Sequence, residues 1–112
     1  MMNVSEYASY DGLGLGELIQ RGDISRQELS EIALGAIETM NPLVNAVIET
    51  YPGAALASAQ PAAHASAKFD GVPFLLKDIG SHDANVTFEL GSRLTKGLKS
   101  PPFASELVNR FR

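Results

Sequence analysis

FDGVPFLLKDIG, residues 69–80, is the stretch from which we predict the fold of this 112-residue chain. Its apolar run VPFLL, residues 72–76, is typical of a strand that is buried on both faces. Lys77 and Asp78 follow directly, and Gly80 comes shortly after them. Because the segments that leave a rigid scaffold often carry functional groups, Lys77 is the first candidate for a functional residue.

Two helices are predicted upstream of this stretch. Residues 13–21 form the first, which we expect to end at Gly22. The second begins with a capping box, SRQE at 25–28, in which the serine hydroxyl and the glutamate carboxylate each accept from the other residue's backbone N–H. Apolar residues then recur with helical periodicity. Asn41-Pro42 is predicted to end this helix, because the residue before a proline disfavours the α conformation.

The remaining elements are shorter. NAVIET, residues 45–50, predicts a strand, and the alanine-rich residues 53–68 predict a helix that Pro61 kinks or divides. His64 has no partner at a metal-ligand spacing, so we expect a solvated side chain. The expected order along the chain is helices over 13–40, strands at about 45–50 and 72–76, a loop over 78–102 and the start of a helix over 105–112.

Composition and charge argue against several classes of function. The formal net charge of −4 gives an acidic surface that does not attract phosphate or anionic lipid, so neither nucleic acid nor a membrane is an expected partner. Without cysteine there are no disulfides or thiolate metal ligands, and adjacent His82-Asp83 alone do not make a metal site. No signal segment or apolar run of about 18 residues occurs, so we predict a cytoplasmic protein.

FDGVPFLLKDIG resembles the lysine motif of the amidase signature family, which hydrolyses amides and related C–N bonds. FDGVPFLLKD also resembles the branch of the family that contains hydrolases of cyclic nylon oligomers, although the sequence assigns no substrate. The resemblance begins near residue 11 and takes in three further segments, LGELIQRGDISRQELSEIALGAIETMNPLVNAVIET, TFELGSRLTKGL and SELVNRFR.

The resemblance implies an α/β/α fold with a mixed sheet and a Ser–cis-Ser–Lys triad. Lys77 would accept a proton from the cis-serine, which activates the nucleophilic serine, and an acyl-enzyme forms on a small-molecule amide substrate. Backbone amides supply the oxyanion hole, and no metal or organic cofactor is required. A lysine acts as a base near neutral pH only where burial favours its neutral form. We therefore expect Val72, Phe74 and Leu76 to surround Lys77.

The chain departs from the family pattern because no segment resembles the glycine-serine-rich stretch that holds both serines. We predict an N-terminal portion of an amidase that ends before that stretch and is inactive alone. Ser92 matches an earlier glycine-serine pair with a structural loop role, and Ser81, Ser100 and Ser105 are not expected to be nucleophiles. Ala104 stands where the family often has an acidic helix cap, which would cost about 1 kcal/mol.

Two other functions remain open. A non-catalytic remnant or dimerisation module would share the family resemblance, and its uncovered strands predict self-association. A helix-turn-helix DNA-binding module is a remote alternative, suggested by LGELIQRGDISRQELSEIALG. Residues 26–40 of its would-be recognition helix hold one arginine and three glutamates, a net charge of −2 that phosphates would repel.

Overall fold

The computed structural model describes residues 2–53 and 67–111 of the chain. The chain divides into two compact units, Met1–Pro73 and Phe74–Arg112. None of the described helices is long and apolar enough to cross a membrane. Each unit is described separately below.

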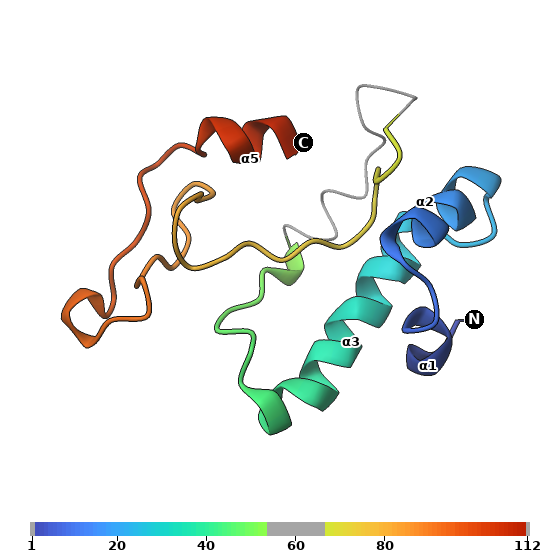
Figure 1. Cartoon of the computed structure of the whole chain (residues 1–112), viewed down its shortest axis with the longest axis horizontal. Coiled ribbons are helices and arrows are strands. Elements are labelled where there is room, and N and C mark those ends of the chain that lie inside the picture. The colour runs from blue at the N-terminus through green and yellow to red at the C-terminus, as the bar shows by residue number, and fades with distance from the viewer. Residues whose placement is uncertain (1, 54–66, 112) are drawn as a thin grey trace. The chain divides into compact units, whose positions relative to one another are not determined.

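The first unit is built from three helices, α1 (Val4–Tyr7), α2 (Gly12–Arg21) and α3 (Arg26–Val44), of which α1 packs against α3 (Figure 1). A polar side chain caps the start of each helix by accepting a backbone N–H of the first turn, which would otherwise lack a partner. The three capping residues are Asn3, Asp11 and Ser25.

The turn between α2 and α3 depends on Gly22, as the sequence predicts. Its φ of 77° is left-handed, a conformation that costs glycine nothing and most other residues about 1 kcal/mol. The backbone N–H of Gly22 donates to the carbonyl of Ile19 at 3.0 Å, and that of Asp23 donates to the carbonyl of Leu18 at 2.9 Å. These two bonds form a Schellman motif, which ends α2.

The predicted capping box at the start of α3 is confirmed. The backbone N–H of Glu28 donates to Ser25 Oγ at 3.1 Å, and the backbone N–H of Ser25 donates to Glu28 Oε2 at 3.0 Å. Hydrogen bonds from the backbone and then the hydroxyl of Ser25 hold the pKa of the Glu28 carboxyl below its usual value of 4.5.

Acid is therefore expected to weaken the start of α3. Since folding lowers the pKa of Glu28, its contribution to stability is complete above about pH 4.5 and is lost as the pH falls through the lower folded pKa. Circular dichroism at 222 nm between about pH 5 and pH 3 should show a loss of helix that is smaller in Glu28→Gln than in the wild type. Glu17→Gln, an exposed change on α2, is the control. Equal losses in all three proteins would contradict this role of Glu28.

The core of the first unit lies where α2 and α3 meet. Leu29 is completely buried, and burial of such a side chain contributes about 1.5–3 kcal/mol. The other buried apolar residues are Leu15, Leu18, Ile19 and Ile24, with Met2, Tyr7, Ile32 and Val72 packed against them. The apolar face predicted for α3 is thus used at its N-terminal half, while Met40 is exposed.

Residues 67–73 are held against α2 and α3. The half-buried guanidinium of Arg26 forms an ion pair with the Asp70 carboxylate, and its Nε lies 3.4 Å from Oδ1. Gly16 of α2 directly adjoins the carbonyl oxygen of Lys68, and a Cβ atom at this position would collide with it. Residues 67–73 therefore contact α2 and α3 through the Arg26–Asp70 ion pair and through the close approach of the Lys68 carbonyl to Gly16.

The predicted end of the second helix at Asn41-Pro42 is wrong, because α3 continues to Val44. The proline ring fixes a φ compatible with a helix, and its missing N–H leaves only the carbonyl of Glu38 without a backbone partner. Glu38 is exposed, so water can replace that bond. The helix ends at Asn45, which has a left-handed φ of 48°.

The predicted α/β fold with a mixed sheet is also wrong for the described residues, which contain no strand. At 45–50 the Asn41 side chain binds the backbone of Val47: it donates to the Val47 carbonyl at 2.7 Å and accepts its N–H at 2.8 Å. In a sheet these two backbone groups would bond to a neighbouring strand. Residues 72–76 have no strand beside them, and an unpaired strand is not stable. The alanine-rich segment with Pro61 and His64 lies within 54–66, outside the described residues.

The second unit is mostly irregular, with a 3-10 helix η1 (Arg93–Thr95) and a short helix α5 (Glu106–Phe111). An isolated antiparallel bridge joins Thr87 and Lys99. Within the predicted loop 78–102, the chain thus folds back on itself. The helix predicted at 105–112 corresponds to α5, and the Oγ of Ser105 accepts the N–H of Val108 at 3.4 Å. Ser105 therefore caps α5, and the cap penalty expected at Ala104 does not arise.

Candidate functional site

Lys77 is exposed, and so are the apolar residues before it. Phe74 is 67% exposed and Leu75 is 66% exposed, so the predicted strand buried on both faces is absent here. The expected enclosure of Lys77 by Phe74 and Leu76 is therefore not found in the described residues.

Asp78, the next residue, holds a distant part of the second unit. Its Oδ1 accepts the backbone N–H of Glu89 at 2.9 Å, and its Oδ2 accepts that of Gly91 at 3.1 Å. The two carboxylate oxygens thus bind two backbone donors of one turn. We call this pair of hydrogen bonds the Asp78 clasp. No sequence signal near Lys77 indicates it, because the donors lie more than ten residues downstream.

Hydrogen bonds to Glu89 also stabilise the turn at Glu89–Gly91. Leu90 and Gly91 have left-handed φ values of 56° and 64°, which turn both donors toward one acceptor. The backbone N–H of Ser92 donates to the Glu89 carbonyl at 3.0 Å, and that of Gly97 donates to Glu89 Oε1 at 2.6 Å. Glu89 is therefore at the centre of a set of local bonds that stabilise the turn.

The serines of the second unit serve the backbone. Ser92 Oγ accepts the N–H of Leu94 at 3.2 Å and caps η1, which confirms its predicted structural role. Ser100 is buried, donates to the carbonyl of Asp83 at 2.5 Å and accepts the N–H of Val86 at 3.0 Å. Ser100, like Ser92 and Ser105, therefore has its hydroxyl in a bond to the local backbone.

His82 packs among aromatic rings. Its ring centroid lies 5.5 Å from that of Phe88 and 6.1 Å from that of Phe103. Its Nδ1 lies 3.3 Å from the backbone carbonyl of Asp83. Among the described residues, no group of three or more histidine, aspartate and glutamate side chains could hold a metal ion.

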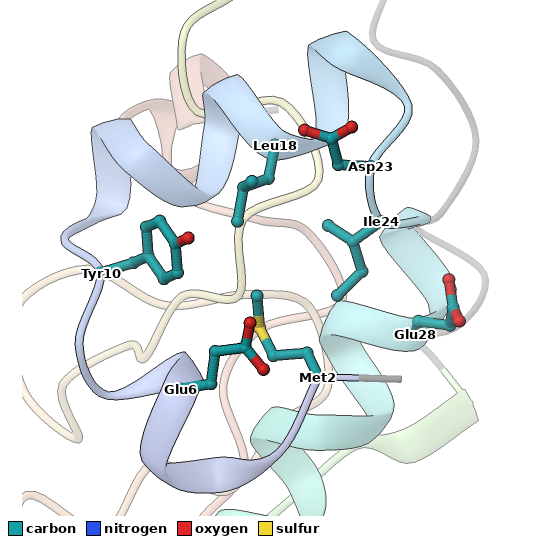
Figure 2. Close-up of a pocket in the computed structure, with 7 residues that line it drawn as sticks. All are labelled: Met2, Glu6, Tyr10, Leu18, Asp23, Ile24 and Glu28. Atoms are coloured by element: carbon teal, nitrogen blue, oxygen red, sulfur yellow. The ribbon is translucent and has the colours of Figure 1, made fainter.

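The first unit contains a cavity of about 260 Å³ with an apolar floor and an acidic rim. Figure 2 shows the side chains of Met2, Leu18 and Ile24 converging, while the carboxylates of Asp23 and Glu28 point away from them. Both carboxylates have local partners, since Asp23 pairs with Arg21 at 2.7 Å and Glu28 binds Ser25. These two carboxylates therefore hold the local structure at the start of α3 and in the turn before it. The residues that line the cavity are Met2, Glu6, Tyr10, Leu18, Asp23, Ile24 and Glu28.

Comparison with known proteins gives three kinds of relative. The chain is 33% identical over 96 residues to a glutamyl-tRNA(Gln) amidotransferase subunit of Chloroflexus aurantiacus, a match that covers 80% of this chain and 19% of the relative. It is 39% identical over 69 residues to the 6-aminohexanoate-cyclic-dimer hydrolase of Paenarthrobacter ureafaciens, covering 62% of this chain and 13% of the relative. It is 36% identical over 76 residues to the lipoamidase of Enterococcus faecalis, a match that covers 68% of this chain and 10% of the relative.

The chain thus spans about a fifth or less of the length of these relatives. No protein-family model and no solved structure matches it. A match that covers 80% of the chain leaves about a fifth unmatched, so the segment shared with the amidotransferase includes Lys77 wherever it starts.

Proposed function

From the partial homology of this chain to the amidase signature family, we propose that it supplies the lysine-bearing segment of an amide C–N hydrolase. The observation that carries the proposal is the shared segment around Lys77. Two of the three relatives have names that denote hydrolysis of amides, and the cyclic-dimer hydrolase agrees with the branch that FDGVPFLLKD resembles.

In the proposed reaction Lys77 is the base of a Ser–cis-Ser–Lys triad. The nucleophilic serine attacks the carbonyl carbon of a small-molecule amide while its proton passes to the cis-serine, and the proton of the cis-serine passes to Lys77 Nζ. The amine leaves with a proton, and water then releases the acid from the acyl-enzyme. No part of the 112 residues resembles the segment that holds both serines, so in this proposal residues outside these 112 supply them.

The exposure of the lysine motif fits this proposal. Phe74 and Leu75 expose more apolar surface than a finished active site would leave in water. In the proposed enzyme the remainder of the amidase domain covers these residues. That cover would also take Lys77 out of water.

A chimaeric enzyme tests the proposal. The segment of the Paenarthrobacter ureafaciens hydrolase that is homologous to this chain is replaced by the corresponding residues of this chain, extended through Lys77 and the turn at Glu89–Gly91 as far as Gly97. Hydrolysis of the cyclic dimer by the chimaera, measured as amine release, is the expected result. A chimaera that folds cooperatively but shows no hydrolysis would contradict the proposal.

The exposed apolar segment also favours a second candidate function, an interaction module. The 112-residue chain is expected to self-associate, because association of two copies would bury the apolar surface at Phe74 and Leu75. Sedimentation velocity should give a mass above the 11.9 kDa of the monomer. Phe74→Ser with Leu75→Ser should restore the monomer, whereas Leu94→Ser, at a site that is 94% exposed, should not. A wild-type monomer with a cooperative melt would contradict this expectation.

DNA binding is not favoured. Arg26, the cation in the first turn of α3, is paired with Asp70. The glutamates of α3 then dominate its charge, and phosphate neutralisation is what usually supplies affinity for DNA.

A further inference from the structure

We infer that Asp78 is a positioning residue for Lys77, acting through the Asp78 clasp. The inference rests on the proposed function, because it concerns how the proposed base is held. It depends on contacts within the second unit alone, where Asp78 joins the lysine motif to the turn at Glu89–Gly91.

The clasp restrains the backbone beside Lys77 at two points. Each carboxylate oxygen of Asp78 accepts one N–H, at 2.9 Å and 3.1 Å, so neither translation nor rotation of the carboxylate is free. Hydrogen bonds to an ionised acceptor are about twice as strong as those between neutral groups. The turn itself is fixed by its bonds to Glu89, so the clasp ties Lys77 to a rigid neighbour.

The clasp also determines what the negative charge of Asp78 does. An ion pair with Asp78 would hold the Lys77 side chain against its neighbour and away from the cis-serine. In the described part of the chain, the two carboxylate oxygens accept backbone N–H groups and no ion pair joins Asp78 to Lys77. The Asp78 carboxylate is thus held by backbone amides and not by the Lys77 amine.

Substitutions at Asp78 separate the effect of its two hydrogen bonds from the effect of its negative charge. Asparagine keeps one acceptor oxygen but turns an NH₂ donor toward the second N–H, so one of the two bonds is lost. Alanine removes both bonds. Glutamate keeps the charge, but its extra methylene displaces the oxygens. Glu106→Gln, which removes an exposed carboxylate of the same unit, is the matched control for the change of charge.

Amide hydrogen exchange of the 112-residue chain measures the clasp without reference to activity. The N–H groups of Glu89 and Gly91 are expected to exchange about tenfold faster or more in Asp78→Ala, and only one of them in Asp78→Asn. In Glu106→Gln both should exchange at the wild-type rate. Unchanged exchange of both amides in Asp78→Ala would overturn the clasp, and with it the inference.

Kinetics of the chimaeric hydrolase measure the positioning. Asp78→Ala is expected to lower kcat by about tenfold to a hundredfold, because misplacing a catalytic group by about 1 Å can cost a factor of this size. KM should change by less than about twofold, and Asp78→Glu should recover part of kcat. Faster exchange with unchanged kcat would overturn the positioning role. An inactive unmutated chimaera would instead overturn the proposed function, and exchange would still report on the clasp.

Discussion

Replacing Lys77 by alanine in the chimaeric hydrolase is expected to lower kcat/KM by about 10²- to 10⁴-fold. This is the usual contribution of a positioned general acid or base. Without Lys77, no group accepts the proton of the cis-serine. The nucleophilic serine must then attack as a neutral hydroxyl. The measurement is the initial rate of amine release at several substrate concentrations, with folding checked by circular dichroism.

Two further variants decide what Lys77 contributes. Lys77→Arg keeps the positive charge but cannot release its proton near neutral pH, so it should be as inactive as the alanine variant. Lys96→Ala, at an exposed lysine of the same unit, should keep wild-type activity. Full activity in Lys77→Arg would mean that a charge, and not a base, is needed at this position. Full activity in Lys77→Ala would favour the interaction module.

Leu29→Ala is expected to lower the free energy of unfolding by about 2–5 kcal/mol. Leu29 is the one completely buried large side chain among the described residues, and it lies where α2 and α3 pack together. Alanine removes the transfer free energy of the deleted atoms and leaves a cavity that neighbours such as Leu18 fill only in part. For a small unit with few buried residues, a loss of this size is a large share of total stability.

Urea denaturation followed by circular dichroism at 222 nm measures this loss. Leu94→Ala is the matched control, because it makes the same chemical change at a side chain that is 94% exposed, and it should shift the free energy by less than about 0.5 kcal/mol. A Leu29→Ala protein as stable as the Leu94→Ala protein would show that the α2–α3 core does not determine the stability of the chain.

Helices α2 and α3 of the first unit can be predicted because their signals are local. Ser25 and Glu28 lie three residues apart, and each satisfies a donor of the other without help from the rest of the protein. Gly22 likewise ends α2 through its own φ and two adjacent bonds. Such elements depend on residues within one or two turns, which a single sequence displays directly.

The strands cannot be predicted correctly in the same way, because a strand requires a partner. The apolar run of residues 72–76 has the composition of a buried strand, yet Phe74 and Leu75 are exposed. At 45–50, the Asn41 side chain competes for the backbone of Val47, and no periodicity reveals that competition. Pro42 predicts a helix end, although the last turn of α3 accommodates it.

The candidate site is only partly visible in the sequence. A motif identifies Lys77, but the motif does not reveal its exposure, because burial depends on what covers a residue. The Asp78 clasp has no sequence signal, because its donors are backbone N–H groups, which every residue other than proline possesses. Only the left-handed turn at Leu90 and Gly91 orients them toward Asp78.

The ion pair between Arg26 and Asp70 has a consequence for the order in which the first unit assembles. The two residues are 44 positions apart, whereas the contacts that join α2 to α3 span a short turn. Closing a long loop costs more chain entropy than closing a short one. The α2–α3 hairpin is therefore expected to form first, with residues 67–73 docking onto it afterwards. During synthesis at the ribosome, the hairpin can form while the lysine motif is still being translated.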